Sequence, residues 1–357
     1  MFGVVHTKGA PVAASRSGGG DFADIRSAWG ELGSHAVYFF QTLEWMELLE
    51  GRLEGDVAWV AIFADGRPAA VSVLLRSVRR GAGINFRRLF RAPLGEAQML
   101  YADGLLDSDA FGQHHLRELM DASGPWHLLR LAGLRVGSPW LELADAGVAR
   151  AEPDRGVGVL DTGLAFDESW RAVPKNMRNS IRKARRKIDE NGGAEITVAT
   201  GLEMGAAYER FLELEASGWK ADQGGGLANM PIEGGLWRDY LRVSDTAQVR
   251  SLRVDGRLAA AQITVTCART LFLPRIAYNE ELASLSPSNV LMADLFEVCC
   301  NDPAIDQIDC MMWQPWHQRW GMAREPTYSL AIFNHRTVRG LAGQAAQSLR
   351  SRIRSSG

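Results

Sequence analysis

The stretch TLFLPRIAYNEELASLSPSNVLMADLFEVCCNDPAIDQIDCMMWQPWHQRWG, residues 270–321, predicts a strand, a loop, a helix and a second strand in that order. Residues 270–278 have the composition of a strand, and residues 290–300 carry apolar side chains at helical spacing. Residues 307–313 predict the second strand. This order places a helix N-terminus, with its free N–H groups, beside the end of a strand, where an anionic ligand can bind.

The loop Ser284-Leu-Ser-Pro-Ser-Asn289 has residues that suit a helix start. Ser286 is a residue type that caps helices with its side chain. Pro287 fits the first helical position, where a missing N–H costs nothing. We therefore expect a serine-capped helix that begins at residue 287.

Composition indicates a soluble globular protein. The 357 residues are 46% hydrophobic and 23% charged, with a net charge of −2, so there is no global electrostatic case for binding nucleic acid. The four cysteines lack zinc-site spacing, which favours core packing in a reducing cytosol. No secretory signal, membrane-spanning run or metal constellation is found, so we expect a cytoplasmic protein without a metal.

The chain shows an internal duplication. Residues 59–78 (WVAIFADGRPAAVSVLLRSV) and 249–268 (VRSLRVDGRLAAAQITVTCA) each predict a strand, an Asp-Gly-Arg turn, Ala-Ala and a second strand. Asp-Gly between apolar runs is a strong hairpin signal. A helix and a strand follow in the same order in both halves. The predicted fold class is therefore α/β (α+β), a tandem duplication with mixed, mostly antiparallel sheets flanked by helices.

The duplication suggests domain boundaries. We expect a disordered leader over residues 1–21, a first half over 22–150, a second half over 155–335, and a basic C-terminal helix and tail over 336–357. We expect that last helix to dock against the second half, and contact with anionic lipid or a nucleotide is the alternative. The first half is expected to be a scaffold or an acceptor-binding surface.

A basic amphipathic helix is predicted over residues 174–190 (PKNMRNSIRKARRKIDE). Its cations indicate one of three roles: binding a phosphorylated or polyanionic substrate, contacting RNA, or forming a solvated helix face without a ligand. With a net charge of −2 and no pattern of stacking aromatics, RNA is the weakest of the three.

The ordered set of motifs resembles the FemAB-like branch of the GNAT acyltransferase superfamily, in particular its BioF2-like (CelD-type) acetyltransferase domain. The resemblance covers about residues 35–335 and rests on these motifs: Phe40-Gln-Thr-Leu-Glu-Trp45, Trp170 with the basic helix, Glu215-Ala-Ser-Gly-Trp-Lys220, Asp255-Gly-Arg257, Tyr278, Ser286-Pro-Ser-Asn289, Asp309 and Trp316-His-Gln-Arg-Trp-Gly321.

The resemblance implies tandem GNAT-like domains and transfer of an acyl group, usually from acyl-CoA, to an amine or hydroxyl. Some relatives modify exopolysaccharide or cell-envelope precursors, and Fem enzymes use aminoacyl-tRNA. Typical GNAT enzymes bind the CoA diphosphate with a glycine-containing loop, whereas residues 284–289 contain no glycine. Pro287 also removes one amide donor.

Three residues are candidates for catalysis. Asp309 is a mid-strand charge that suits a base or a substrate anchor, or an ion pair with Arg275 or Arg319 that orders the sheet. Glu215 suits binding or deprotonation of the acceptor, and an exposed helix carboxylate is the alternative. Tyr278 ends the first strand, where a general acid is needed, although a core tyrosine is equally plausible.

The resemblance also implies binding residues. The acyl-CoA co-substrate, acetyl-CoA or another, is expected along residues 276–291, at Ile276, Ala277, Ser286, Ser288, Asn289 and Val290. The expected acceptor residues are Trp219, Lys220, Arg275, Trp316 and Arg319.

The predicted function is a cytoplasmic acyl-CoA-dependent N-acyltransferase that acts on an amine of a polysaccharide or cell-envelope precursor. A location at the inner face of the membrane is the alternative to a free cytoplasmic protein. The acceptor is expected in the cleft between the halves. The alternatives are a Fem-type aminoacyl-tRNA-dependent transferase, or a catalytically silent protein that senses a nucleotide and regulates exopolysaccharide synthesis. The missing glycines favour the silent protein, and Asp309, Tyr278 and Glu215 oppose it.

Overall fold

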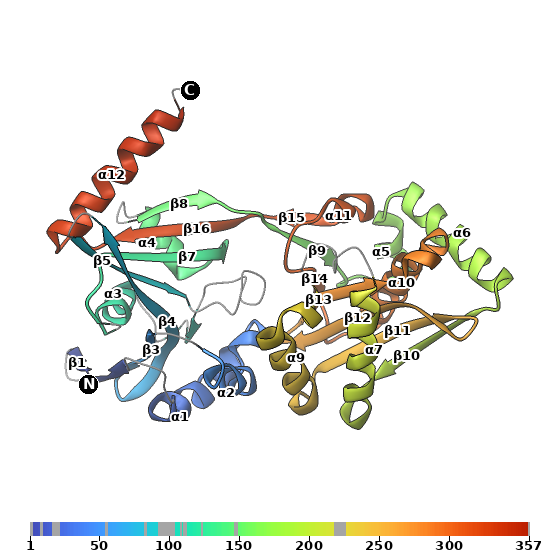
Figure 1. Ribbon diagram of the computed structural model, residues 1–357, viewed down its shortest axis with the longest axis horizontal. Helices are drawn as coiled ribbons and strands as arrows, with labels where there is room; N and C mark the ends of the chain where they lie inside the picture. The colour runs from blue at the N-terminus through green and yellow to red at the C-terminus, as the bar shows by residue number, and fades with distance from the viewer. Residues whose placement is uncertain are drawn as a thin grey trace. The chain divides into compact units, whose positions relative to one another are not determined.

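The computed structural model describes residues 3–7, 10–15, 22–53, 56–81, 84–91, 104–107, 109, 113–122, 124–145, 149–217 and 226–355. The chain divides into two compact units (Figure 1). The first unit comprises Met1–Ala36, Phe40–Gly156 and Pro326–Gly357, and the second comprises Val37–Phe39 and Val157–Glu325.

The first unit is built on a mixed sheet of the order β3-β4-β5-β7-β16-β8, with β6 also paired to β4. Its strands are β3 (Asp56–Ala64), β4 (Arg67–Gly81), β5 (Ile84–Arg91), β6 (Leu105–Leu106), β7 (Leu128–Arg135), β8 (Ala149–Pro153) and β16 (Thr327–Phe333). Its helices are α1 (Ala23–Glu31), α2 (Leu43–Glu50), α3 (Gln113–Ala122), α4 (Pro139–Asp145) and α12 (Val338–Ser355). Only the β5–β7 pair of this sheet is parallel.

The predicted disordered leader contains regular structure. β1 (Gly3–Thr7) and β2 (Ala10–Ser15) pair as an antiparallel ribbon. Their sequences, GVVHT and APVAAS, carry β-branched valines, which favour strands over disorder. The prediction was wrong at these residues because it weighted the Gly, Ser and Ala content over the short valine runs.

The second unit is built on a sheet of the order β10-β11-β12-β13-β14-β9-β15. Its strands are β9 (Val157–Asp161), β10 (Ala194–Ala199), β11 (Ala247–Val254), β12 (Arg257–Cys267), β13 (Thr270–Tyr278), β14 (Gln307–Asp309) and β15 (Ala323–Glu325). Its helices are α5 (Phe166–Ala172), α6 (Lys175–Glu190), α7 (Met204–Ala216), α9 (Pro231–Val243), α10 (Pro287–Cys300) and α11 (Pro315–Trp320). A short 3-10 helix, η5 (Glu280–Leu285), precedes α10.

The two sheets confirm the predicted duplication. Each contains a hairpin whose Asp-Gly turn has positive φ at both residues, 49° and 80° at Asp65-Gly66 and 48° and 70° at Asp255-Gly256. The pairing of β3 with β4 shifts register between Ile62 and Phe63, and that of β11 with β12 shifts between Leu252 and Arg253, at the same offset of 190 residues. Each hairpin is followed by a strand that pairs in parallel with the strand after the next long helix.

The boundary of the second half differs from the prediction at its C-terminal end. β16, which was assigned to residues 155–335, pairs with β7 and β8 of the first unit. α12 follows it there: Arg336 forms an ion pair with Asp121 at 3.0 Å, and Arg339 Nη1 donates to the Asn85 carbonyl at 3.2 Å. The expected docking of this helix on the second half was therefore wrong.

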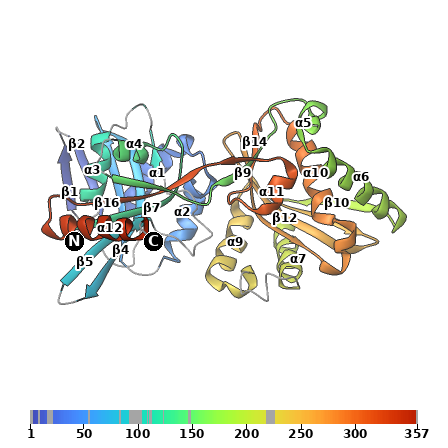
Figure 2. The same ribbon diagram turned by 90° about the horizontal axis from the view of Figure 1, so that it is seen from above.

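Two helices of the second unit position the site. α7 packs on β11, β12 and β13 from one face of the sheet, and α10 packs on the same strands from the other (Figures 1 and 2). α6 packs on α10 through buried Met177, Ile181, Ala184 and Ile188, as its apolar spacing predicts. Trp219 and Lys220, which precede η4 (Leu227–Asn229) in the sequence, lie outside the described residues.

Candidate active site

β13 is paired on both sides only over its first third. Its parallel ladder with β14 joins Thr270–Phe272 to Gln307–Asp309. β14 is shorter than predicted because Met311 has a φ of 61°, a left-handed conformation that ends the strand. From residue 273 to Tyr278, β13 continues beside β12 alone.

The backbone groups of residues 273–278 alternate between the two edges of β13. Asn279 N–H donates to the Ala259 carbonyl of the β12 side at 2.9 Å. Because antiparallel ladders alternate residue by residue, Ala277 also faces β12, and the backbone groups of Ile276 and Tyr278 face the opposite edge. Backbone groups at that edge are placed to contact a ligand that lies along β13.

The start of α10 differs in detail from the predicted cap. Pro287 occupies the first turn as expected, but the Ser286 side chain makes no capping hydrogen bond. Ser286 has φ 48° and ψ 48°, whereas a capping side chain needs the extended region. Its carbonyl instead accepts from the N–H groups of Asn289 at 3.1 Å and Val290 at 3.3 Å.

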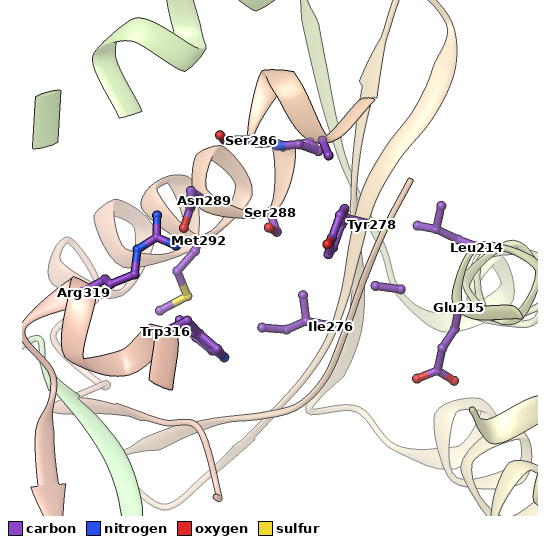
Figure 3. Close-up of a pocket in the computed structure, with 13 residues that line it drawn as sticks. Leu214, Glu215, Ile276, Tyr278, Ser286, Ser288, Asn289, Met292, Trp316 and Arg319 are labelled. Atoms are coloured by element: carbon purple, nitrogen blue, oxygen red, sulfur yellow. The ribbon is translucent and has the colours of Figure 1, made fainter. Parts of the chain in front are cut away.

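A pocket of about 440 Å³ surrounds the end of β13 (Figure 3). Figure 3 shows side chains of α10 and α11 on one side of this strand, and Leu214 and Glu215 of α7 on the other. Its size is within the range of ligand sites. It is lined by Leu214, Glu215, Ile276, Ala277, Tyr278, Ala283, Ser286, Pro287, Ser288, Asn289, Met292, Trp316 and Arg319.

Most of the predicted site residues lie together in this pocket. It contains the predicted catalytic residues Glu215 and Tyr278, and most of the expected donor and acceptor residues. Among the described residues, the predicted site residues that do not line it are Asp309, Val290 and Arg275. Val290 is buried in a core cluster under α6, so its side chain is structural.

Glu215 has a defined position in the pocket wall. Its side chain is 2% exposed, and Oε2 accepts a hydrogen bond from Leu227 N–H at 2.7 Å. The alternative of an exposed helix carboxylate is therefore wrong. A buried carboxylate that accepts from a backbone N–H in the wall of a ligand pocket is suited to binding or deprotonating an amine.

Asp309 supports the turn that ends β14. It is fully buried, and Oδ1 accepts from Met311 N–H at 2.6 Å, which stabilises the left-handed residue. In the part of the chain that the structure describes, neither Arg275 nor Arg319 forms an ion pair with it. The structure thus shows a local role for Asp309 at this turn, and its catalytic role stays a prediction.

α11 carries Trp316 and Arg319 into the pocket and is anchored at its base. Trp320 is fully buried, and its Nε1 donates to Asn289 Oδ1 at 3.0 Å, which links α11 to the first turn of α10. At the other end, Gln314 and His317 form a reciprocal capping box. The two ends together hold the Trp316 ring and the Arg319 guanidinium at the pocket.

His317 is a structural histidine. It is 1% exposed, and its Nδ1 accepts from Gln314 N–H at 3.0 Å, so Nε2 carries the proton of the neutral ring. Gly158 of β9 packs against it, since a Cβ there would lie 2.3 Å from Nδ1. Burial lowers the pKa of His317 from 6.5 to about 4.

The lowered pKa of His317 predicts a pH dependence of stability. In the unfolded chain His317 binds a proton near pH 6.5, whereas in the folded protein it does so only near pH 4. The contribution of the neutral His317 to the free energy of unfolding is therefore complete above pH 6.5 and is lost as the pH falls from 6.5 to 4. We expect this residue to account for about 3 kcal/mol of that loss at most. Denaturant unfolding of wild type and His317→Gln between pH 7 and 4 measures it. An equally steep loss in the variant would contradict the expectation.

Sequence reasoning missed four residues of the pocket, Leu214, Ala283, Pro287 and Met292, as ligand contacts. Met292 lies four residues after Ser288, so it occupies the same face of α10 one turn later. Leu214 and Ala283 carry no chemical signal and depend on tertiary packing.

Comparisons with known proteins identify the class. Residues 175–319 match the family model of an acetyltransferase (GNAT) domain. A search of curated proteins finds no match. Among solved structures, FemX aligns with a TM-score of 0.61 at 11% identity, covering 90% of this chain and 98% of that one.

Two further structures align over nearly the whole chain. The C-terminal domain of a putative lysylphosphatidylglycerol synthetase from Agrobacterium fabrum has a TM-score of 0.55 at 12% identity, covering 92% of this chain and 98% of that chain. L-PGS from Bacillus licheniformis has a TM-score of 0.54 at 14% identity, covering 87% of this chain and 95% of that chain. At sequence identities of 11% to 14%, the similarity to these three structures shows a shared fold and nothing further.

The match to the family model identifies residues 175–319 as a GNAT-type acetyltransferase domain. The second unit contains the matched domain, and the fold of the chain is similar to that of FemX and of the other two structures, which confirms the resemblance found in the sequence.

Neither a metal-binding group nor a membrane-spanning helix is found among the described residues. No group of three or more His, Cys, Asp or Glu side chains is placed there to hold a metal ion. No helix in the same part of the chain is both long and apolar enough to span a membrane.

Proposed function

We propose that this protein transfers an acyl group, such as acetyl, from acyl-CoA to an amine of a polysaccharide or cell-envelope precursor. The observation that carries the proposal is the pocket around the end of β13, with the start of α10 on one side and the Glu215 carboxylate on the other. Donor and acceptor on opposite sides of one strand edge would meet there, and such positioning supplies much of the acceleration.

The donor side fits a diphosphate, with fewer backbone donors than a glycine-rich loop has. The positive end of α10 opens into the pocket, where the Ser288 N–H and the hydroxyls of Ser286 and Ser288 are available beside Arg319. Arg319 would supply the positive charge that Pro287 and the missing glycines do not. Bound acyl-CoA would supply the activated thioester.

The chain's own residues provide the proton transfers. Glu215 would take the proton from the attacking amine, and the Tyr278 hydroxyl would protonate the departing thiolate. The backbone of Ile276 and Tyr278 faces the edge where the thioester carbonyl would lie and is placed to polarise it. The Trp316 ring beside Arg319 offers the flat surface and positive charge that suit a sugar or nucleotide portion of the ligands.

Calorimetric titration with acetyl-CoA tests the donor side. Wild type should bind, and Arg319→Gln should bind about tenfold or more weakly, because a charge-assisted contact is lost. Arg269→Gln is the matched control, since Arg269 is exposed, pairs with Asp306 and does not line the pocket. No heat with wild type at millimolar acetyl-CoA would contradict the proposal.

The aminoacyl-tRNA alternative is favoured by one observation. α6 exposes six cations, Lys175, Arg182, Lys183, Arg185, Arg186 and Lys187, enough for a polyanion to bind. Binding of total tRNA that weakens steeply with salt, together with no binding of acetyl-CoA, would replace acyl-CoA as the donor. Binding of acetyl-CoA without transfer to any amine would favour the silent nucleotide sensor.

A further inference from the structure

Arg275 lies on β13 beside the acceptor side of the pocket. It pairs with Ile263 of β12, and it shares a strand face with Ala277, two residues further along. Ala277 lines the pocket together with Leu214 and Glu215 of α7, the helix that covers this face. The arginine is therefore the next side chain along the same face from the pocket wall.

The Arg275 guanidinium has unused hydrogen-bonding capacity. Its Nη2 nitrogen is buried and has no hydrogen-bond partner among the described residues. A buried donor on a charged group is costly to leave unsatisfied, and a buried cation is usually paired. Arg275 as a residue is partly buried, whereas Arg250 of the same sheet is buried and forms an ion pair with Asp294 at 2.5 Å, although its Nε also has no partner among the described residues.

Two polar side chains on the α7 side of β13, those of Tyr208 and Glu215, already form hydrogen bonds. Burial raises the pKa of Tyr208 well above its usual value, the charges of Arg238 and Arg275 oppose the rise, and that of Glu215 adds to it. The Tyr208 hydroxyl donates to the Gly234 carbonyl at 2.9 Å. The Glu215 Oε2 accepts from Leu227 N–H. The Arg275 guanidinium and the Glu215 carboxylate thus belong to the same side of β13, the side that α7 covers.

We propose that Arg275 binds a carboxylate of the acceptor, so that the substrate class is an amine that also carries a carboxylate. This inference rests on the proposed function, in which Glu215 receives the amine of the same molecule. An amino acid, a peptide end or an amino-sugar acid has the two charges that this pair would recognise. The planar guanidinium fork matches a carboxylate with two parallel hydrogen bonds.

Matched amines test the inference on the unmodified protein. With CoA present to occupy the donor side, calorimetry compares L-alanine with L-alaninamide, L-lysine with L-lysinamide, and glucosaminuronic acid with glucosamine. We expect the carboxylate member of at least one pair to bind about 10- to 100-fold more tightly. Absence of a carboxylate preference in every pair, while acetyl-CoA still binds, overturns this inference and leaves the proposed function standing.

A third arm separates carboxylate from phosphate recognition. Phosphoethanolamine and ethanolamine differ by a phosphate alone, and a guanidinium binds phosphate as well. A stronger preference for phosphoethanolamine than for any carboxylate would overturn the assignment. If acetyl-CoA itself does not bind, the proposed function fails as well.

Variants of Arg275 supply the second readout. Arg275→Gln should abolish the carboxylate preference and leave acetyl-CoA binding unchanged, and Arg275→Lys, which keeps the charge but not the fork, should weaken it. Arg257→Gln is the control, because Arg257 is exposed and pairs with Glu281 away from the pocket. Since Nη2 has no partner among the residues that the structure describes, Arg275→Gln should not lower the Tm. A lowered Tm with an intact carboxylate preference would make Arg275 structural and overturn the proposal.

Discussion

Replacing Glu215 with glutamine should reduce the rate of acyl transfer by about 100-fold or more and leave acetyl-CoA binding unchanged. The amide cannot accept the proton of the amine. Its oxygen can still accept the hydrogen bond from Leu227 N–H, which is 2.7 Å long in wild type, so the fold should persist. Steady-state kcat and calorimetric Kd for acetyl-CoA, measured on the same preparations, check the two halves of this expectation.

The matched control for this substitution is Glu213→Gln. Glu213 lies on the same helix, two residues earlier, but is exposed and does not line the pocket. Its kcat should equal that of wild type. If Glu215→Gln turned over as fast as Glu213→Gln, the carboxylate would have no part in proton transfer, and the acceptor side of the site would need another base.

Trp320→Ala should lower the free energy of unfolding by about 3–5 kcal/mol, the largest stability effect that we expect. The side chain is fully buried, packs edge-on against Trp170 with ring centroids 6.5 Å apart, and donates to Asn289 Oδ1. Its loss leaves a large cavity and detaches α11 from α10. Denaturant unfolding measures the loss in stability.

Trp320→Phe provides the comparison for that prediction. It retains most of the buried apolar volume and removes the indole donor, so it should cost about 1 kcal/mol. Because α11 carries Trp316 and Arg319, Trp320→Ala should also weaken acetyl-CoA binding at temperatures where it remains folded. A loss below about 1 kcal/mol for Trp320→Ala would contradict the anchoring role.

The duplicated hairpins could be predicted because their signal is local. Asp65-Gly66 and Asp255-Gly256 adopt positive φ at both positions, which few other residue pairs do at low cost. The strand–helix–strand order of residues 270–313 is likewise present in the structure, because apolar periodicity and the Pro287 start are local features. β13 and α10 supply Tyr278 and the first turn of α10 to the pocket, which Glu215 of α7 also lines.

Long-range pairing could not be predicted in the same way. A strand such as β16 has the same composition whichever sheet it joins, so its place beside β7 and β8 was missed. Asp309 was singled out because a charge in the middle of a strand needs a reason, and the sequence does not show that this carboxylate accepts from a backbone N–H two residues later. Ser286 was expected to cap α10, but the residue adopts a left-handed conformation and its side chain makes no capping hydrogen bond.

Amide hydrogen exchange with and without acetyl-CoA tests the central claim, that the acyl donor lies along β13 and on the start of α10. We predict that ligand slows exchange within residues 276–292, which hold most of the pocket-lining positions, and leaves the hairpin of β3 and β4 unchanged. Saturating acetyl-CoA that leaves residues 276–292 unprotected, or that protects another region in their place, would contradict the account.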